Sequence, residues 1–228
     1  MSIKVAINGL GRIGRSILKL VVDQPAFDLV AVNDLADPEN LAYLLRFDTV
    51  YGRYSKPVAV VGDDLVIGGR TVHALTERDP LALPWKALGV DLVFECTGAH
   101  TKREDLEKHI RAGARWVLLS APSKAEDVET VVHGASVPGT DTRIISCASC
   151  TTNCITRSVI SRTTSTLNSA LNARRSRRSI CLLDFIRHLR PEIRASQAST
   201  KSSQSQHQLT VYSRGSSPRQ SDARERTR

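Results

Sequence analysis

Three cysteines within a short stretch are the residues of this sequence best suited to chemistry. Cys147, Cys150 and Cys154 lie among hydroxyl side chains and one amide in Ser-Cys-Ala-Ser-Cys-Thr-Thr-Asn-Cys, residues 146–154. Such a cluster is compatible with a nucleophilic thiol, a metal or iron–sulfur site, a redox dithiol, or buried cysteines that act as small apolar residues.

The spacing of these cysteines argues against a metal. A zinc site takes four ligands, usually in two pairs, and no second pair or suitable histidine lies nearby. An iron–sulfur site needs a fourth cysteine, and Cys181 is distant in the sequence. A helix that begins near Thr151 would place Cys150 at its N-terminus, where N–H groups and the helix dipole stabilise a thiolate. Cys154 would then lie one turn later and face the core.

A glycine-rich turn precedes the cluster by more than a hundred residues. Gly9, Gly11 and Gly14 follow a β-rich run over residues 3–8, and a helical pattern follows at once. The first glycine permits a tight turn, the second lets backbone approach a pyrophosphate, and the third allows close packing of helix on strand. The N–H groups at the start of the helix would bind the phosphates.

An acidic residue lies at the distance that a dinucleotide site requires. Residues 27–32 read as a second strand that ends in Asn33-Asp34, and Asp34 follows Gly14 by 20 residues. A carboxylate there binds ribose hydroxyls and repels a 2′-phosphate, which favours NAD over NADP. A glycine turn with an unrelated surface aspartate is the alternative.

Strands and helices alternate through the first two thirds of the chain. Further strands are expected at 91–96, 116–120 and 144–145, with a helix at 102–112 between the first two. This order predicts an α/β fold with a Rossmann-type, doubly wound and mostly parallel sheet. Ligands of such sheets lie at the carboxyl ends of strands, which here carry Gly9, Asp34, Thr97 and Ser120. Cys96, just before that edge, is expected to be a packed core thiol.

Charge divides the chain into two unlike parts. Residues 1–156 hold 17 Lys+Arg against 19 Asp+Glu, a net of −2, whereas residues 157–228 hold 15 against 4, a net of +11. The second part contains 15 Ser and 14 Arg and few apolar runs, which is poor material for a core. We expect an NAD-binding domain at 1–149, the start of a catalytic helix at 150–155, and a tail of low order at 156–228.

The composition also bounds the location of the protein. The chain starts with a strand pattern directly after Met1, from which we expect no signal peptide. No apolar run approaches the roughly 20 residues of a membrane span. The chain has five cysteines, and an odd number does not suit a secreted disulfide framework. We therefore expect a cytoplasmic protein with reduced thiols and no membrane partner.

Six segments in order resemble the glyceraldehyde-3-phosphate dehydrogenase family, which includes the similar erythrose-4-phosphate dehydrogenases. They cover residues 1 to about 155 and comprise Asn-Gly-Leu-Gly-Arg-Ile-Gly-Arg at 8–15, Asn-Asp at 33–34, Phe-Asp-Thr-Val-Tyr-Gly at 47–52, Glu-Cys-Thr-Gly at 95–98, Ser-Ala-Pro-Ser-Lys at 120–124, and Ala-Ser-Cys-Thr-Thr-Asn-Cys at 148–154.

The resemblance implies an NAD-dependent oxidation of a sugar-phosphate aldehyde in glycolysis and gluconeogenesis. It implies that the Cys150 thiolate attacks the aldehyde, and that inorganic phosphate cleaves the resulting thioester to an acyl phosphate. Ser149 and Thr151 match positions that bind the attacking phosphate. Arg12, Ile13, Asp34 and Ser120 match positions that hold NAD. Members of the family form homotetramers, which we do not extend to this chain.

The resemblance ends after residue 155. Family members carry a histidine about 26 residues after the nucleophile, where it lowers the pKa of the thiol and moves protons. Residues 172–178 read Asn-Ala-Arg-Arg-Ser-Arg-Arg here, and no counterpart of the substrate domain is recognisable. The abrupt Arg/Ser-rich sequence suggests a reading frame lost just after Ile155, and we expect NAD binding with impaired catalysis. The alternative is a non-catalytic NAD-binding module with a basic RNA-binding tail.

Overall fold

The structure is a computed structural model of the 228-residue chain, and it describes residues 2–132, 135–136, 138–139, 141–153 and 155–156. Almost all of the predicted tail, and Cys154, lie outside these residues. The described residues belong to one compact unit. Among their helices, none has both the length and the apolar character that crossing a membrane requires.

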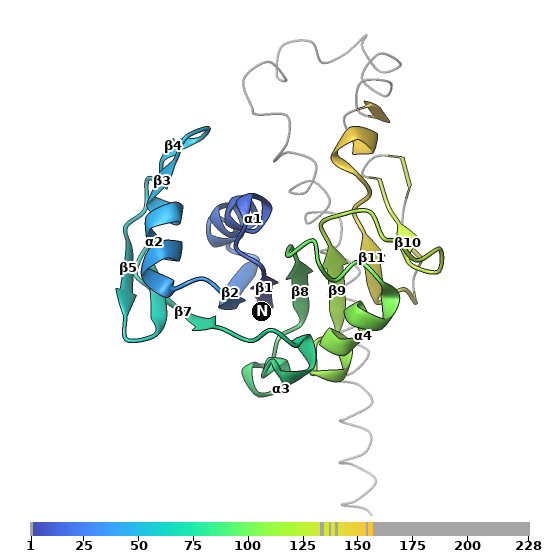
Figure 1. Ribbon diagram of the computed structural model, residues 1–228, viewed down its shortest axis with the longest axis horizontal. Coiled ribbons are helices and arrows are strands. Elements are labelled where there is room, and N and C mark those ends of the chain that lie inside the picture. The colour runs from blue at the N-terminus through green and yellow to red at the C-terminus, as the bar shows by residue number, and fades with distance from the viewer. Residues whose placement is uncertain (1, 133–134, 137, 140, 154, 157–228) are drawn as a thin grey trace, which may run out of the picture. The chain divides into compact units, whose positions relative to one another are not determined.

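A nine-stranded sheet organises the described part of the chain (Figure 1). The strand order is β10-β11-β9-β8-β1-β2-β7-β6-β5, and every pair from β10 to β7 is parallel. The pairs β7–β6 and β6–β5 are antiparallel. The mostly parallel α/β fold predicted from the sequence is therefore confirmed, with an antiparallel extension at one edge.

The strands are β1 (Ile3–Asn8), β2 (Phe27–Asn33), β3 (Phe47–Asp48), β4 (Gly52–Arg53), β5 (Val58–Val61), β6 (Asp64–Ile67), β7 (Arg70–Leu75), β8 (Leu92–Glu95), β9 (Trp116–Leu119), β10 (Glu129–Thr130) and β11 (Ile144–Ser146). The helices are α1 (Arg12–Val22), α2 (Pro38–Arg46), α3 (Trp85–Leu88) and α4 (Arg103–Arg111), with a 3₁₀ turn at Pro80–Ala82. The hairpin of β3 and β4 forms a separate two-stranded sheet. Its two-residue strands are too short to produce an alternating pattern, so the sequence did not predict them.

Helices cover both faces of the parallel part of the sheet. Figure 1 shows α1 on one face and α3 with α4 on the other. The apolar stripe of α1, namely Ile17, Leu18, Val21 and Val22, is buried as its periodicity predicts. The central strands are buried on both faces, which explains their nearly continuous apolar sequences.

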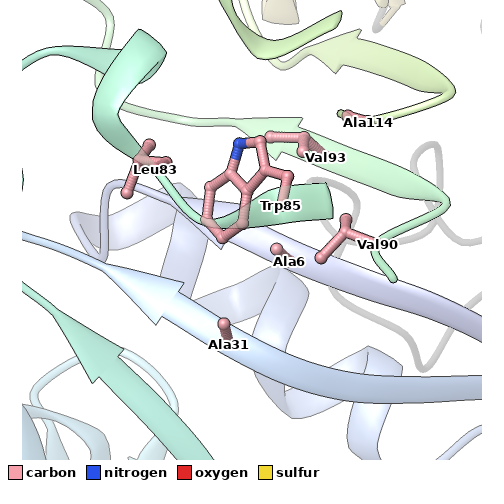
Figure 2. Close-up of a cluster of buried hydrophobic side chains, with 7 residues drawn as sticks. All are labelled: Ala6, Ala31, Leu83, Trp85, Val90, Val93 and Ala114. Carbon is pink, nitrogen blue, oxygen red and sulfur yellow. The ribbon is translucent and has the colours of Figure 1, made fainter. Parts of the chain in front are cut away.

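One apolar cluster packs around the indole of Trp85, which is fully buried (Figure 2). The small side chains of Ala6 on β1 and Ala31 on β2 lie beneath it and leave room for the large ring. Val93 of β8 belongs to the same cluster, so Trp85 joins α3 to the centre of the sheet. This packing holds the strands whose ends carry the candidate site.

Candidate functional site

The glycine turn between β1 and α1 has the geometry expected of a phosphate-binding loop. Gly9 has φ +91°, and a Cβ added there would lie 2.7 Å from the Thr97 backbone nitrogen. A Cβ at Gly14 would lie 1.9 Å from the Gly9 carbonyl oxygen, so helix and strand pack too closely for any side chain. A Cβ at Gly11 would meet no atom within 4 Å. The backbone at Gly11 is thus open to a pyrophosphate, and the site fits a dinucleotide.

The first turn of α1 is arranged to receive an anion. Its N-cap is Gly11, which provides no side chain to cap the N–H groups, and the turn contains no acidic residue. Arg12 is exposed, and half of the Ile13 surface is accessible. The helix N-terminus therefore offers N–H groups, the positive end of the dipole and a nearby guanidinium to a phosphate.

Asp34 and Asn33 occupy the end of β2 but have different roles in the structure. Each Asp34 carboxylate oxygen accepts one backbone N–H, Oδ2 from Leu10 at 2.6 Å and Oδ1 from Ala36 at 3.0 Å. The half-buried carboxylate is thereby held beside the glycine turn with lone pairs left for ribose hydroxyls. Asn33 is buried, and its amide bonds to Asn8 and to the Glu77 backbone. The Asn33 side chain therefore stabilises the carboxyl edge of the sheet through contacts within the protein.

Thr97 and Ser120 follow β8 and β9 at the same edge. The Thr97 hydroxyl donates to Glu95 and accepts the Ala99 N–H at 3.1 Å, so it shapes its own loop. Ser120 is hydrogen-bonded to Cys96, and burial raises the pKa of the Cys96 thiol to about 12. The raised pKa keeps the Cys96 thiol protonated, but the residue is partly accessible and lies at the margin of the core, not fully packed within it as expected.

Cys150 is exposed and is the first residue of a helical segment, as predicted. The segment 150–153 follows β11 after a turn in which Ala148 adopts φ +59°, a conformation that is strained for a residue with a Cβ. The turn is tied to the next strand end, since Cys147 N–H donates to Leu119 O at 2.9 Å and the Ser146 hydroxyl to Ala121 O at 2.8 Å. These bonds anchor the thiol segment to the strand end that carries Ser120.

Ser149 is the N-cap of the helical segment 150–153. Its hydroxyl oxygen accepts the Thr152 N–H at 3.0 Å and lies 2.7 Å from the Thr152 hydroxyl. The Asn153 amide donates to the carbonyl oxygens of Cys147 at 2.7 Å and Ser149 at 3.0 Å, which locks the turn. Thr151 is exposed one residue beyond Cys150. Within the described residues, no group of three or more His, Cys, Asp or Glu is placed to hold a metal ion.

A buried carboxylate beneath the edge was missed by the sequence reasoning. Glu95 is fully inaccessible, yet its pKa is lowered. Burial by itself raises the pKa, and hydrogen bonds from His109, Thr97 and Asn8 outweigh that effect. The sequence did contain a signal for His109, the buried partner of Glu95. His109 lies three residues after Leu106 and therefore on the same face of α4 as that buried leucine.

Comparisons with known proteins agree with this geometry. Residues 3–103 match the family model described as glyceraldehyde 3-phosphate dehydrogenase, NAD binding domain. The chain is 48% identical over 158 residues to glyceraldehyde-3-phosphate dehydrogenase of Geobacillus stearothermophilus, which covers 68% of this chain and 47% of the relative. The Streptomyces coelicolor enzyme is 47% identical over 159 residues, again 68% of this chain and 47% of the relative. The chain thus spans a little under half the length of these relatives. Residues 3–103 therefore carry the NAD-binding domain of the glyceraldehyde-3-phosphate dehydrogenase family.

Proposed function

We propose that the chain binds NAD at the carboxyl edge of its sheet and presents Cys150 as the nucleophile for phosphorylating oxidation of glyceraldehyde 3-phosphate in the cytoplasm. The observation that carries the proposal is the joint placement of two features. The open glycine turn and Asp34 follow β1 and β2, and the exposed thiol follows β11 in the same parallel sheet. Ligands of such sheets bind at this edge.

The reaction requires a thiol, a hydride acceptor and inorganic phosphate. The Cys150 thiolate adds to the aldehyde carbon and forms a thiohemiacetal. Conversion of the thiohemiacetal to a thioester removes a hydride, for which bound NAD would supply the acceptor, and the hydroxyl proton, which passes to a base or to water. Attack of phosphate on the thioester carbonyl expels the thiolate and yields the acyl phosphate. Ser149 and Thr151, which flank the thiol, are the proposed phosphate contacts.

We further propose that catalysis by this chain is impaired. The neighbourhood where the family carries its proton-transferring histidine, residues 172–178, contains four arginines and no histidine. Loss of a general base costs on the order of 10²–10⁴ in rate. A reading frame lost after residue 155 would produce this sequence. Translating the gene in all three frames tests that origin: a histidine about 26 residues after Cys150 in another frame supports it, and its absence from every frame refutes it.

The activity is tested on the purified 228-residue chain. NAD binding is measured by calorimetry, and acyl-phosphate formation is measured with glyceraldehyde 3-phosphate and phosphate, with Cys150→Ser as the matched control. We expect NAD binding by both proteins, slow turnover by the native chain and none by the variant. Absence of NAD binding refutes the cofactor role, turnover at the rate of intact relatives refutes the impairment, and residual activity in Cys150→Ser refutes the nucleophile.

The charge of residues 157–228 supports the alternative function of an NAD-binding module that also binds RNA. A net charge of +11, carried mainly by arginine, would release counterions from a polyanion. RNA affinity should then fall steeply with salt. Replacing Arg174, Arg175, Arg177 and Arg178 by glutamine should flatten the salt dependence by about one unit of slope per lost contact. An unchanged slope would refute the RNA-binding function.

A further inference from the structure

A line of buried polar side chains connects the strand ends beneath the candidate NAD site. Asn33 ends β2, Asn8 ends β1 and Glu95 ends β8, and the line continues through His109 of α4 to Trp85 of α3. No residue among these five is more than 4% exposed. Such a buried network is costly unless each of its groups is paired, so the direction of each hydrogen bond matters.

The direction is determined at the Asn33 end by the backbone. The Glu77 N–H can only donate, and it donates to Asn33 Oδ1 at 2.8 Å. The Asn33 amide nitrogen therefore faces Asn8 and donates to Asn8 Oδ1 at 2.7 Å. Asn8 must in turn direct its own amide nitrogen at Glu95 Oε2, at 2.6 Å.

The direction is determined at the other end by Trp85. An indole N–H can only donate, and it donates to His109 Nδ1 at 3.0 Å. In Figure 2 the indole nitrogen of Trp85 lies on the side of the ring that is turned away from Ala6 and Ala31. His109 consequently carries its proton on Nε2 and donates it to Glu95 Oε2 at 3.0 Å. The imidazole is neutral because Nδ1 must remain an acceptor.

All of these donors converge on one carboxylate. Oε2 of Glu95 accepts from Asn8 and His109, and Oε1 accepts the Thr97 N–H at 2.8 Å and the Thr97 hydroxyl. Each surrounding group except the hydroxyl is oriented by its own partners and can only donate. The three fixed N–H donors, from Asn8, His109 and Thr97, therefore favour an ionised Glu95, and the Thr97 hydroxyl is the one neighbour able to accept a proton from it.

We propose that Glu95 is a positioning residue for NAD binding, whose ionised carboxylate holds the Asn8–Gly9 turn against the Thr97 loop. The two segments touch, because a Cβ on Gly9 would lie 2.7 Å from Thr97 N. Beyond the paired strands the Cys96 N–H still donates to Asn8 O at 2.7 Å, and the Glu95 side chain adds a second link, between Asn8 and the Thr97 loop. The inference rests on NAD binding by the domain and is independent of the thiol chemistry.

The test is the isosteric variant Glu95→Gln in the full chain. Its amide NH₂ must face either the Thr97 N–H or the Asn8 and His109 donors, so one set of bonds is lost in either orientation. We expect the Kd for NAD to rise about tenfold, which corresponds to the loss of one hydrogen bond to a charged group. We also expect faster hydrogen exchange at the Thr97 amide while the β1 amides stay protected.

The matched control is Val93→Ala on the same strand, since Val93 is fully buried and its side chain forms no hydrogen bond. It should lower the unfolding midpoint and leave the Kd for NAD within about twofold. The inference is overturned if Glu95→Gln binds NAD as tightly as the native chain, or if Val93→Ala weakens binding equally. Failure of the native chain itself to bind NAD would instead overturn the proposed function.

A measurement on the native protein keeps the inference testable if Glu95→Gln does not fold. Nitrogen-15 NMR of His109 should show a ring that carries its proton on Nε2 and accepts a hydrogen bond at Nδ1. In Trp85→Phe, which keeps an aromatic ring and removes the N–H donor, the Nδ1 signal should shift because it loses its hydrogen bond, while Nε2 stays protonated against Glu95. A charged imidazole, or an Nδ1-protonated ring in the native chain, contradicts the network.

Discussion

Individual side chains at the sheet edge differ sharply in chemical character. Cys150 is exposed at the start of a helical segment, whereas burial raises the pKa of Cys96 to about 12. The buried Glu95 shows the opposite behaviour, since its hydrogen bonds lower its pKa in spite of burial. At the scale of residues, local hydrogen bonding and access to water decide which groups react.

Alkylation of the native chain should distinguish Cys150 from Cys96. Iodoacetamide reacts with thiolates, and a thiol with a pKa near 12 is almost entirely protonated at pH 7. We expect Cys150 to be labelled more than about 100-fold faster than Cys96, as measured by peptide mass spectrometry over time. Equal labelling in the native state would contradict the raised pKa of Cys96, and equal labelling in urea is the control.

Acid should destabilise the protein partly through Glu95. Because its folded pKa lies below the unfolded value, its contribution to stability is complete above the unfolded pKa and is lost as pH falls through the folded pKa. Glu95→Gln should therefore be less stable than the native chain at pH 7 by about 1–3 kcal/mol, with a difference that shrinks below about pH 4. Urea unfolding across pH measures this. The exposed Glu126→Gln should show no such convergence, and a constant difference for Glu95→Gln would refute the prediction.

At the scale of elements, the turn from β1 to α1 separates folding from binding. Gly9 and Gly14 lie where a Cβ would strike backbone atoms, whereas Gly11 faces open space. Packing of the strand, the turn and the helix thus requires glycine at positions 9 and 14. Packing does not require glycine at position 11, where the backbone is open to a ligand.

Substituting the glycines one at a time should reveal this division. Gly9→Ala should destabilise the chain by about 2–3 kcal/mol, because its φ is +91° and its Cβ would lie 2.7 Å from Thr97 N. Gly11→Ala should cost about 1 kcal/mol or less, since an alanine N-cap is only mildly unfavourable. Both should weaken NAD binding. Calorimetry measures the NAD affinity of each variant, and urea unfolding measures its stability. Full NAD affinity in Gly11→Ala would contradict close approach of the pyrophosphate.

At the scale of the whole molecule, stability depends on packing across the sheet. Trp85 is fully buried, contacts small residues of β1 and β2, and bonds to α4 through His109. The layer of α3 and α4 on one face of the sheet is therefore joined to the centre of the sheet through Trp85.

Removing the indole should affect the entire described unit. Trp85→Ala should lower the free energy of unfolding by about 3–5 kcal/mol through the cavity it leaves, whereas Trp85→Phe should cost less. Urea unfolding followed by circular dichroism measures both. A loss below about 1 kcal/mol for Trp85→Ala would show that the cluster collapses without cost. The exposed Tyr43→Ala, at 57% accessibility, is the control and should change stability little.

The amino-acid sequence by itself determined the features that depend on local pattern. Alternating strands and helices predicted the mostly parallel sheet, the glycine spacing predicted the β1–α1 turn, and the cysteine cluster predicted that Cys150 lies at the start of a helix. Tertiary structure decided the rest. Asn8 and Glu95 are 87 residues apart, and they meet only because β1 and β8 are neighbours in this register. The strand order and register determine which side chains meet beneath the edge, and no local periodicity records either of them.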